Sequence, residues 1–157
     1  MPRTSRELIA ELERTRDETL RYFALPDADL ARTYAPGKWP VAFILRHLAD
    51  SEQVLYERIC RTIAEQPRPA LSYYHEAKWA ENLDYANTPL KIALGIFESV
   101  RSANIHYAGR FYEAQGHLEF VHSEMGVRTL EQEFDKVADH NEHHLKQIRQ
   151  ALGRKEL

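Results

Sequence analysis

The chain has 157 residues, a length typical of one compact domain, and its 43% hydrophobic and 29% charged residues are typical of a folded globular protein. Its 21 basic and 24 acidic residues give a net charge of −3, which argues against a nucleic-acid surface built on bulk positive charge. The single cysteine, Cys60, excludes an intrachain disulfide and any CxxC zinc or redox motif.

The first of four long segments with a helical apolar period begins at Thr4 or Ser5, either of which suits an N-cap. Pro26 ends it, and a turn is expected at Gly37 in the connector that follows. The expected buried positions of this helix are Leu8, Ile9, Leu12, Leu20, Tyr22 and Phe23.

The second helix is expected to begin at Pro40, because the first helical position does not need the N–H that proline lacks. It should end before Pro67, which makes it about 25 residues long. Residues 67–88 are polar and aromatic, with one short helix expected over residues 76–83. The expected buried positions of the second helix are Val41, Ile44, Leu48, Leu55 and Ile59.

The third helix starts at the Thr88–Pro89 signal, and an irregular stretch over residues 114–128 follows it. Thr129 and Gln132 form a capping-box pattern for the fourth helix, which Gly153 ends. The expected buried positions are Leu90, Leu94, Phe97, Val100, Ile105 and Phe111 in the third helix, and Leu130, Phe134, Val137, Leu145, Ile148 and Leu152 in the fourth.

No segment shows the alternation of a β-strand, so an all-α fold is predicted, with one domain over residues 1–157. Four amphipathic helices with two long connectors predict a four-helix bundle with long crossover connections. No apolar run approaches the roughly 20 residues of a membrane-spanning helix, and the N-terminus lacks the apolar core of a secretory signal. We therefore expect a soluble, cytoplasmic protein with neither membrane nor nucleic acid as a partner.

Eight histidines are present, and three of them crowd the last predicted helix. His140 and His144 are four residues apart and share a helix face, roughly 70–110° from the centre of the apolar stripe. His143 falls nearly opposite the stripe, towards solvent. His47 lies at the flank of the second helix's stripe. A bundle that joins these two flanks would bring His47, His140 and His144 to one point.

Three neutral imidazoles leave a divalent metal with an open position, which is the catalytic rather than the structural pattern. Histidines at i and i+4 have the spacing that helical metal sites use. The alternative is that they are surface histidines near a helix C-terminus, partly charged near pH 6.5. The remaining histidines have no paired spacing and are expected to be solvated or singly hydrogen-bonded; they are His75, His106, His117 and His122.

Three motifs resemble those of the DinB-like superfamily. GKWPV at 37–41 with RHLADS at 46–51 resembles its second helix, and HNEHHLKQI at 140–148 resembles its last-helix signature, H-x-x-H-H-x-x-Q-I. YHEAKW at 74–79 is similar to a connector of the YfiT-like branch. The resemblance spans roughly residues 30–152.

The resemblance implies a four-helix bundle with a metal held by His47, His140 and His144, the same residues that the helical faces select. It implies nickel or zinc as the metal and a homodimer as the assembly. Characterised relatives use low-molecular-weight thiols as S-transferases or isomerases, and many others are described only as metal-dependent hydrolases. This chain has Arg46 and Glu52 at positions neighbouring those where the YfiT-like branch often carries further histidines, so the resemblance does not settle substrate choice.

The leading hypothesis is a metal-dependent enzyme in which the cation activates water or a thiol, for hydrolysis or S-transfer on a small-molecule substrate. The sequence does not choose between the two reactions. One alternative is a non-catalytic, dimeric metal-binding module of the stress-response type. Another is a helical interaction protein without metal.

Metal-bound imidazoles usually donate their second N–H to a carboxylate or carbonyl oxygen. The candidates for this contact are Asp50, Glu133, Asn141 and Gln147, although Glu133 could equally be a solvated carboxylate. Aromatic residues of the connectors are candidates for the mouth of a pocket, or alternatively for lids on the core; they are Trp39, Tyr73, Tyr74 and Trp79.

Overall fold

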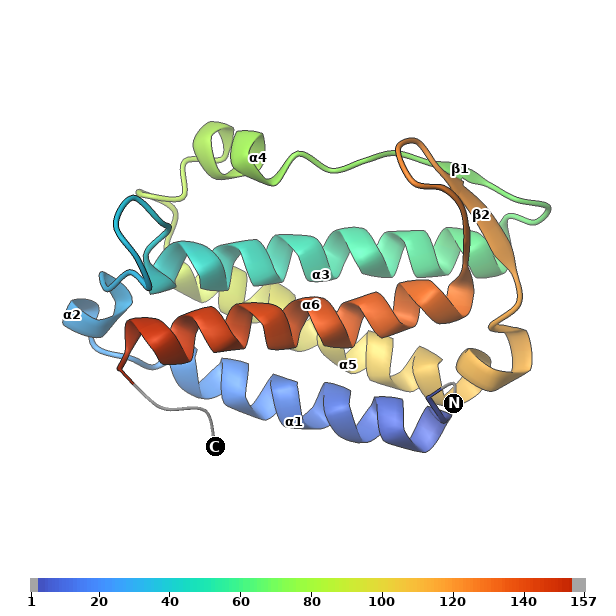
Figure 1. Cartoon of the computed structure of the whole chain (residues 1–157), viewed down its shortest axis with the longest axis horizontal. Helices are drawn as coiled ribbons and strands as arrows, with labels where there is room; N and C mark the ends of the chain where they lie inside the picture. Colours follow the sequence, from blue (N-terminus) through green and yellow to red (C-terminus); the bar gives the residue numbers. More distant parts are fainter. Residues whose placement is uncertain (1–2, 154–157) are drawn as a thin grey trace.

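The structure, a computed structural model, describes residues 3–153 and is dominated by four long helices packed as a bundle (Figure 1). These helices are α1 (Ser5–Phe23), α3 (Val41–Ala64), α5 (Leu90–Gln115) and α6 (Leu130–Ala151), and a short α2 (Asp27–Leu30) precedes α3. The predicted four-helix bundle is confirmed. Within residues 3–153 no helix is both long and apolar enough to cross a membrane.

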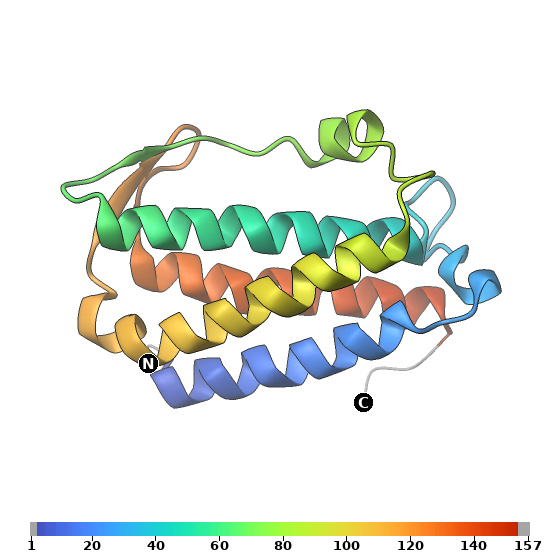
Figure 2. The ribbon, with the colours of Figure 1, turned by 180° about the vertical axis from the view of Figure 1, so that it is seen from behind.

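Helices α3 and α5 run in the same direction, so the chain must return along the bundle between them (Figures 1 and 2). The return segment, residues 65–89, runs along the outside of α3 and carries β1 (Ala70–Leu71) and α4 (Glu76–Asn82). It is one of the long crossover connections that the sequence predicts. Helix α4 matches the short helix expected over residues 76–83.

The expectation that the chain has no strand is wrong. Strands β2 (Glu119–His122) and β3 (Gly126–Thr129) form an antiparallel hairpin within the stretch expected to be irregular, and β1 pairs in parallel with β2. Strands of two to four residues are too short to show alternation. Strand β1 also depends on a partner far along the chain, which a local pattern does not reveal.

Local signals set the ends of the long helices. The Thr129 hydroxyl accepts from the Gln132 backbone N–H while the Gln132 side chain accepts from the Thr129 N–H, which is the predicted capping box. Gly153 follows α6 with a φ of +68°, a conformation that glycine adopts without strain, and α6 stops there as predicted. Pro40 and Pro89 each lie one residue before a helix, as N-caps.

A layer of buried polar side chains divides the bundle core into two apolar clusters. Ile44, Phe97 and Leu145 belong to one cluster, and Leu12 and Phe134 belong to the other. The polar layer between them consists of Thr15, Thr19, Glu52, Arg101, Asn104 and Asn141. All four long helices contribute to this layer, so it joins them at one level of the bundle.

Arg101 is fully buried and lies at the centre of this polar layer. Its guanidinium donates to both carboxylate oxygens of Glu52, at 2.7 and 2.8 Å, and to Asn141 Oδ1 at 2.6 Å. It also donates to the Leu12 carbonyl oxygen and to the Thr15 hydroxyl. Burial of this charge is tolerated because a bidentate carboxylate and further acceptors replace the water it loses.

The buried face of α5 differs from the predicted one because it includes the polar layer around Arg101. Its buried positions are Ala93, Phe97, Arg101, Asn104, Ala108 and Tyr112. Of the predicted stripe only Phe97 is fully buried, while Leu90, Leu94, Val100, Ile105 and Phe111 are partly exposed. A prediction from apolar periodicity assigns arginine and asparagine to the surface. Here Arg101 and Asn104 lie at the centre of the buried face, because other helices supply their hydrogen-bond acceptors.

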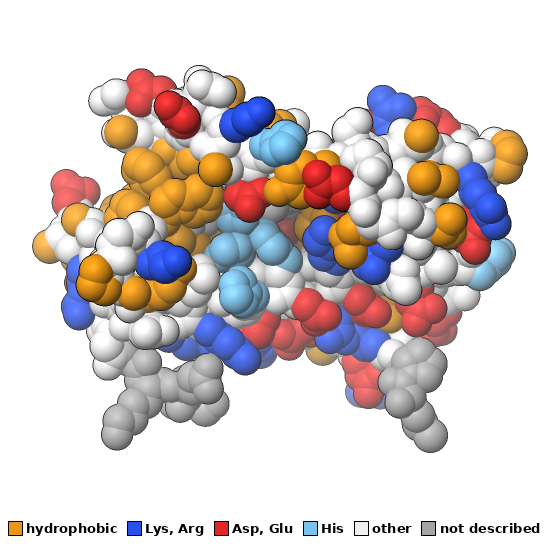
Figure 3. Space-filling view, turned by 45° about the horizontal axis from the view of Figure 1, so that its top comes forward, with side chains coloured by type: hydrophobic (Ala, Val, Ile, Leu, Met, Phe, Trp, Pro, Cys, Tyr) orange, Lys and Arg blue, Asp and Glu red, His pale blue; other side chains and the backbone are white. Residues whose placement is uncertain are grey.

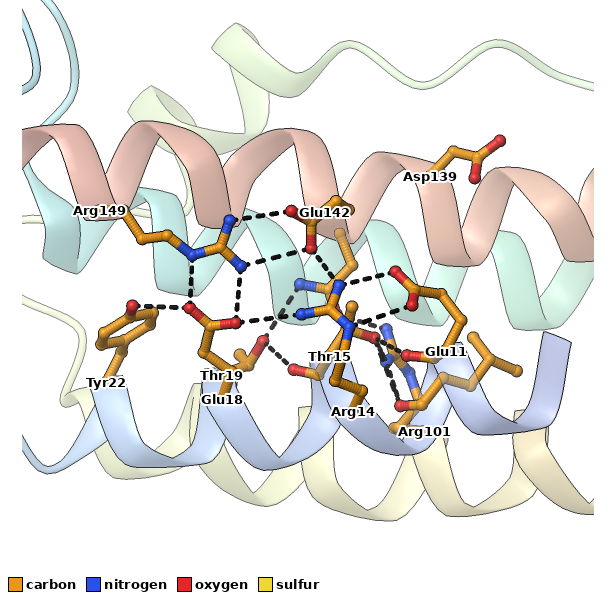
Figure 4. Close-up of polar contacts among 12 residues, drawn as sticks. Glu11, Arg14, Thr15, Glu18, Thr19, Tyr22, Arg101, Asp139, Glu142 and Arg149 are labelled. Atoms are coloured by element: carbon orange, nitrogen blue, oxygen red, sulfur yellow. Dashed lines mark hydrogen bonds and ion pairs between the residues drawn. The ribbon is translucent and has the colours of Figure 1, made fainter. Parts of the chain in front are cut away.

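Charged side chains also link α1 to α6 (Figure 4). Arg149 of α6 donates to Glu18 of α1 at 2.7 Å and to Glu142 at 2.9 Å, and Arg14 of α1 contacts Glu142. These pairs are partly exposed, so each contributes little to stability compared with the buried polar layer.

We expect Arg101→Ala to lower the free energy of unfolding by about 3–5 kcal/mol, because the Glu52 carboxylate stays buried without its partner. Urea unfolding followed by circular dichroism measures this change. The matched control is Arg6→Ala at an exposed position of α1, which should change stability by less than about 0.5 kcal/mol. Equally small losses for both variants would contradict the role assigned to the polar layer.

Candidate metal centre

Three imidazoles meet between α3 and α6. The Nε2 atom of His140 lies 3.1 Å from His47 Nε2 and 3.2 Å from His144 Nε2. Among the residues that the structure describes, these three form the one group of metal-ligating side chains whose ligand atoms all lie within 4.8 Å of one another. The structure therefore brings together the three residues selected from the helical faces.

The rings are held by contacts to their second nitrogens. His144 Nδ1 lies 2.7 Å from Gln147 Oε1, and because an amide oxygen only accepts, Nδ1 carries the hydrogen and the Nε2 lone pair faces the cluster. The Gln147 amide nitrogen donates to the Tyr34 hydroxyl at 3.3 Å, which fixes the amide orientation. His47 Nδ1 lies 3.0 Å from the Tyr74 hydroxyl.

Gln147 contacts an imidazole as expected, and the other three predicted partners bond elsewhere. Asp50 accepts from Tyr85, Glu133 pairs with Arg58, and Asn141 accepts from Arg101. Glu133 is 1% exposed, so the alternative of a solvated carboxylate is also wrong. Helical spacing predicted that these residues lie near the site. Their hydrogen-bond partners come from other elements, and spacing within one helix does not predict such partners.

Asp50 reaches the cluster indirectly through two phenols. Its carboxylate accepts from Tyr85, the Tyr85 hydroxyl interacts with that of Tyr74, and Tyr74 contacts His47. Burial raises the pKa of Tyr74, and burial together with the Asp50 hydrogen bond raises the pKa of Tyr85. Both phenols therefore stay protonated at neutral pH. The sequence prediction identified the carboxylate but missed the two tyrosines that connect it.

The three imidazoles are neutral at physiological pH. Burial, together with the neighbouring imidazoles, lowers the pKa of His47 to about 3, of His140 to about 2 and of His144 to about 4. Neutral imidazole is the form that binds a metal. This argues against the alternative of partly charged surface histidines.

The donor set fits a divalent cation. Ligand nitrogens around a tetrahedral ion with bonds of about 2.1 Å are separated by about 3.4 Å, close to the 3.1 and 3.2 Å measured here. All three donors are imidazole nitrogens, which suit zinc, nickel, copper and iron rather than magnesium or calcium. Three ligands also leave room for a fourth that is not protein.

The cluster lies in the wall of a pocket of about 620 Å³. Figure 3 shows the histidine side chains in a hollow of the surface, with hydrophobic side chains on one side and charged side chains on the other. Trp39, Tyr73 and Tyr74 line the pocket as expected, whereas Trp79 packs against Tyr74, with ring centroids 4.8 Å apart. His143 is exposed as predicted and lies at the same pocket.

Sequence reasoning missed basic residues of this pocket, among them Arg58, His122 and Lys136. His122 was expected to be solvated or singly hydrogen-bonded, but it is 3% exposed, and its Nδ1 accepts from the backbone N–H groups of Glu124 and Met125 at 3.2 Å each. The hairpin that brings it to the pocket was itself not predicted, so no local signal was available.

Comparison with known proteins identifies related chains. A sequence profile of the DinB superfamily matches residues 11–148. A protein of Oceanobacillus iheyensis named "Putative metal-dependent hydrolase" is 30% identical over 130 residues, which cover 83% of this chain and 74% of that protein. A protein of the same description from Bacillus mycoides is 29% identical over 143 residues, which cover 89% of this chain and 80% of that protein.

A similar fold occurs in a solved structure. YfiT from Bacillus subtilis, described as a probable metal-dependent hydrolase with an unusual four-helix bundle topology, superposes with a TM-score of 0.83. The match covers 99% of this chain and 94% of that one at 22% sequence identity. At this identity the comparison shows that the two proteins share the fold.

We expect the metal-free protein to lose stability as the pH falls from 7.5 to 5.5. The folded pKa of each of the three imidazoles lies below its usual value of 6.5, so the unfolded chain binds more protons in this range. Each imidazole then contributes a loss of up to about 1.4 kcal/mol per pH unit below 6.5. Urea unfolding in the presence of a chelator measures the loss.

The matched controls are the triple variant His47→Gln/His140→Gln/His144→Gln, which should lack this part of the pH dependence, and His106→Gln at an exposed site, which should keep it. A decline in the triple variant as steep as that of the wild type would show that the three buried imidazoles are not its source.

Proposed function

This chain belongs to the DinB superfamily, and from that membership and the imidazole cluster we propose that it is a metal-dependent enzyme acting on a small molecule. His47, His140 and His144 would hold a divalent cation through their Nε2 atoms. The observation that carries the proposal is that three neutral imidazole nitrogens face one another in the wall of an accessible pocket.

When bound, such a cation acts as a Lewis acid and lowers the pKa of a coordinated water or thiol, which supplies a nucleophile near neutral pH. The chain's own residues have positioning roles. Gln147 holds His144 in one tautomer, and Tyr74 orients His47. Trp39 packs on the His47 ring with centroids 5.4 Å apart, which shields that side of the cluster from water.

Hydrolysis is the leading reaction, because the similar proteins carry that description. Transfer to a low-molecular-weight thiol is the second candidate, because the same three imidazoles accept a thiolate as the additional ligand of the cation. Zinc and nickel are the proposed metals, since both favour imidazole ligands. The homodimer, the cytoplasmic location and the absence of a nucleic-acid partner stay predictions.

The pocket favours an enzyme over a non-catalytic metal-binding module. Holding a metal requires the ligands and the groups that orient them, but not an adjoining cavity of about 620 Å³ with aromatic and charged walls. Cavities of this size are typical of small-molecule sites.

We expect His47→Ala, His140→Ala and His144→Ala each to abolish stoichiometric metal binding, because two imidazoles hold a cation far less tightly than three. Elemental analysis after dialysis against a weak chelator measures the metal content. His143→Ala and Cys60→Ser, which leave the cluster intact, should bind metal like the wild type. Equal loss in His143→Ala would contradict the ligand assignment.

We expect the zinc- or nickel-loaded protein to hydrolyse p-nitrophenyl acetate or to conjugate cysteine to monochlorobimane, with a turnover that falls about a hundredfold or more in His144→Ala. His106→Ala, at an exposed imidazole that does not line the pocket, is the control and should retain the activity. Stoichiometric metal binding without turnover on a broader panel of esters, amides and thiol acceptors would favour the non-catalytic module.

A further inference from the structure

The hairpin end of the pocket holds a hydrogen-bond donor that lacks an acceptor. His122 Nδ1 accepts two backbone N–H groups, so in the neutral ring the hydrogen is on Nε2. That Nε2 atom is buried and has no hydrogen-bond partner among the described residues. Burial and the positive charges of Arg58, Lys136 and Arg128 lower the pKa of His122, which keeps the ring neutral at pH 7.

The hairpin directs this donor towards the bundle. In β2, Phe120 and His122 are the buried residues, while Val121 between them is exposed. Because the turn residues Glu124 and Met125 occupy Nδ1, the opposite nitrogen points away from the tip of the hairpin. Arg58 of α3 and Lys136 of α6 line the pocket there with His122.

Lys136 supplies a positive charge without a direct partner. It is half-buried, and its side chain makes no hydrogen bond or ion pair with any residue of the described chain. Burial removes part of its hydration and so lowers its pKa. Arg58 differs, because its guanidinium pairs with Glu133 at 3.3 Å and donates to the Ser72 carbonyl oxygen at 2.8 Å.

Donors that converge without an acceptor are suited to an anion. A buried N–H left without a partner destabilises a protein, so a donor without an acceptor calls for an explanation such as a ligand. Glu133 pairs with Arg58, so Lys136 is the cation of this group that has no ion-pair partner. One unpaired cation, with Glu76 and Glu124 also in the pocket wall, complements a carboxylate better than a doubly charged phosphate.

We propose that Lys136 and His122, with Arg58 beside them, form a subsite for a carboxylate group of the substrate. Lys136 precedes His140 on α6 by one helical turn, about 6 Å along the helix axis. The substrate is therefore a carboxylic acid whose reacting group lies a few bonds from its carboxylate. This inference rests on the proposed function, since it assigns the reacting group to the histidine end of the pocket.

The test is a titration of the full-length protein with butanoate and with its uncharged analogue butanamide, followed by the ¹⁵N signals of the His122 ring and by calorimetry. We expect saturable binding of butanoate that shifts the His122 Nε2 signal, and no such shift with butanamide. Equal effects of the two compounds, or tighter binding of phosphate than of butanoate, would overturn the carboxylate assignment.

Variants of Lys136 test the charge directly. Lys136→Gln should weaken butanoate binding at least tenfold. Lys136→Arg keeps the positive charge and should largely keep the binding, which would attribute the loss in Lys136→Gln to the missing charge. Lys146→Gln, at an exposed position of the same helix, is the matched control and should bind like the wild type. Unchanged affinity in a folded Lys136→Gln variant would overturn the subsite.

Measurement with and without metal separates this inference from the proposed function. In chelator-treated protein, binding that depends on Lys136 supports the subsite even if elemental analysis finds no metal at the histidines. Stoichiometric metal with no binding that depends on Lys136, in either the loaded or the chelated protein, overturns the subsite and leaves the metal centre standing.

Discussion

The antiparallel register of α3 and α6 is the constraint on which the histidine cluster depends. Two buried charged contacts fix it: Arg58 of α3 pairs with Glu133 of α6, and Arg101 joins Glu52 of α3 to Asn141 of α6. Arg58 lies eleven residues after His47, and His144 lies eleven residues after Glu133, so the Arg58 pair and the histidine contact share one register. A slip of one residue would turn each imidazole by about 100° away from the others.

The site is assembled at a cost to folding. Three neutral imidazoles and a half-buried lysine are held with lowered pKa values where apolar side chains would pack at lower cost. Buried titratable groups with strongly shifted pKa values concentrate at functional sites. Here they lie along one pocket. Neutral imidazole ligands for a metal are at one end, and hydrogen-bond donors for an anion are at the other, so a substrate would bind in one orientation.

The topology of the bundle supplies the other side of the pocket. Because α3 and α5 run in the same direction, residues 65–89 must travel back along the outside of α3 (Figures 1 and 2). This return places Tyr74 against His47, and its strand β1 pairs with the hairpin strand that carries His122. The connector that the helix directions require is therefore also the element that orients one ring of the cluster and lines the pocket.

Features governed by neighbours along the chain were determined by the sequence itself: the capping box at Thr129, the stop at Gly153, and the shared face of His140 and His144. Each depends on contacts within about one helical turn, which the order of residues fixes. Only the tertiary structure decided which groups complete the site. Arg101 lies in the core because its acceptors come from other helices. Tyr74 and His122 reach the pocket through pairing between distant segments, and such contacts depend on the packed register of the whole bundle rather than on local periodicity.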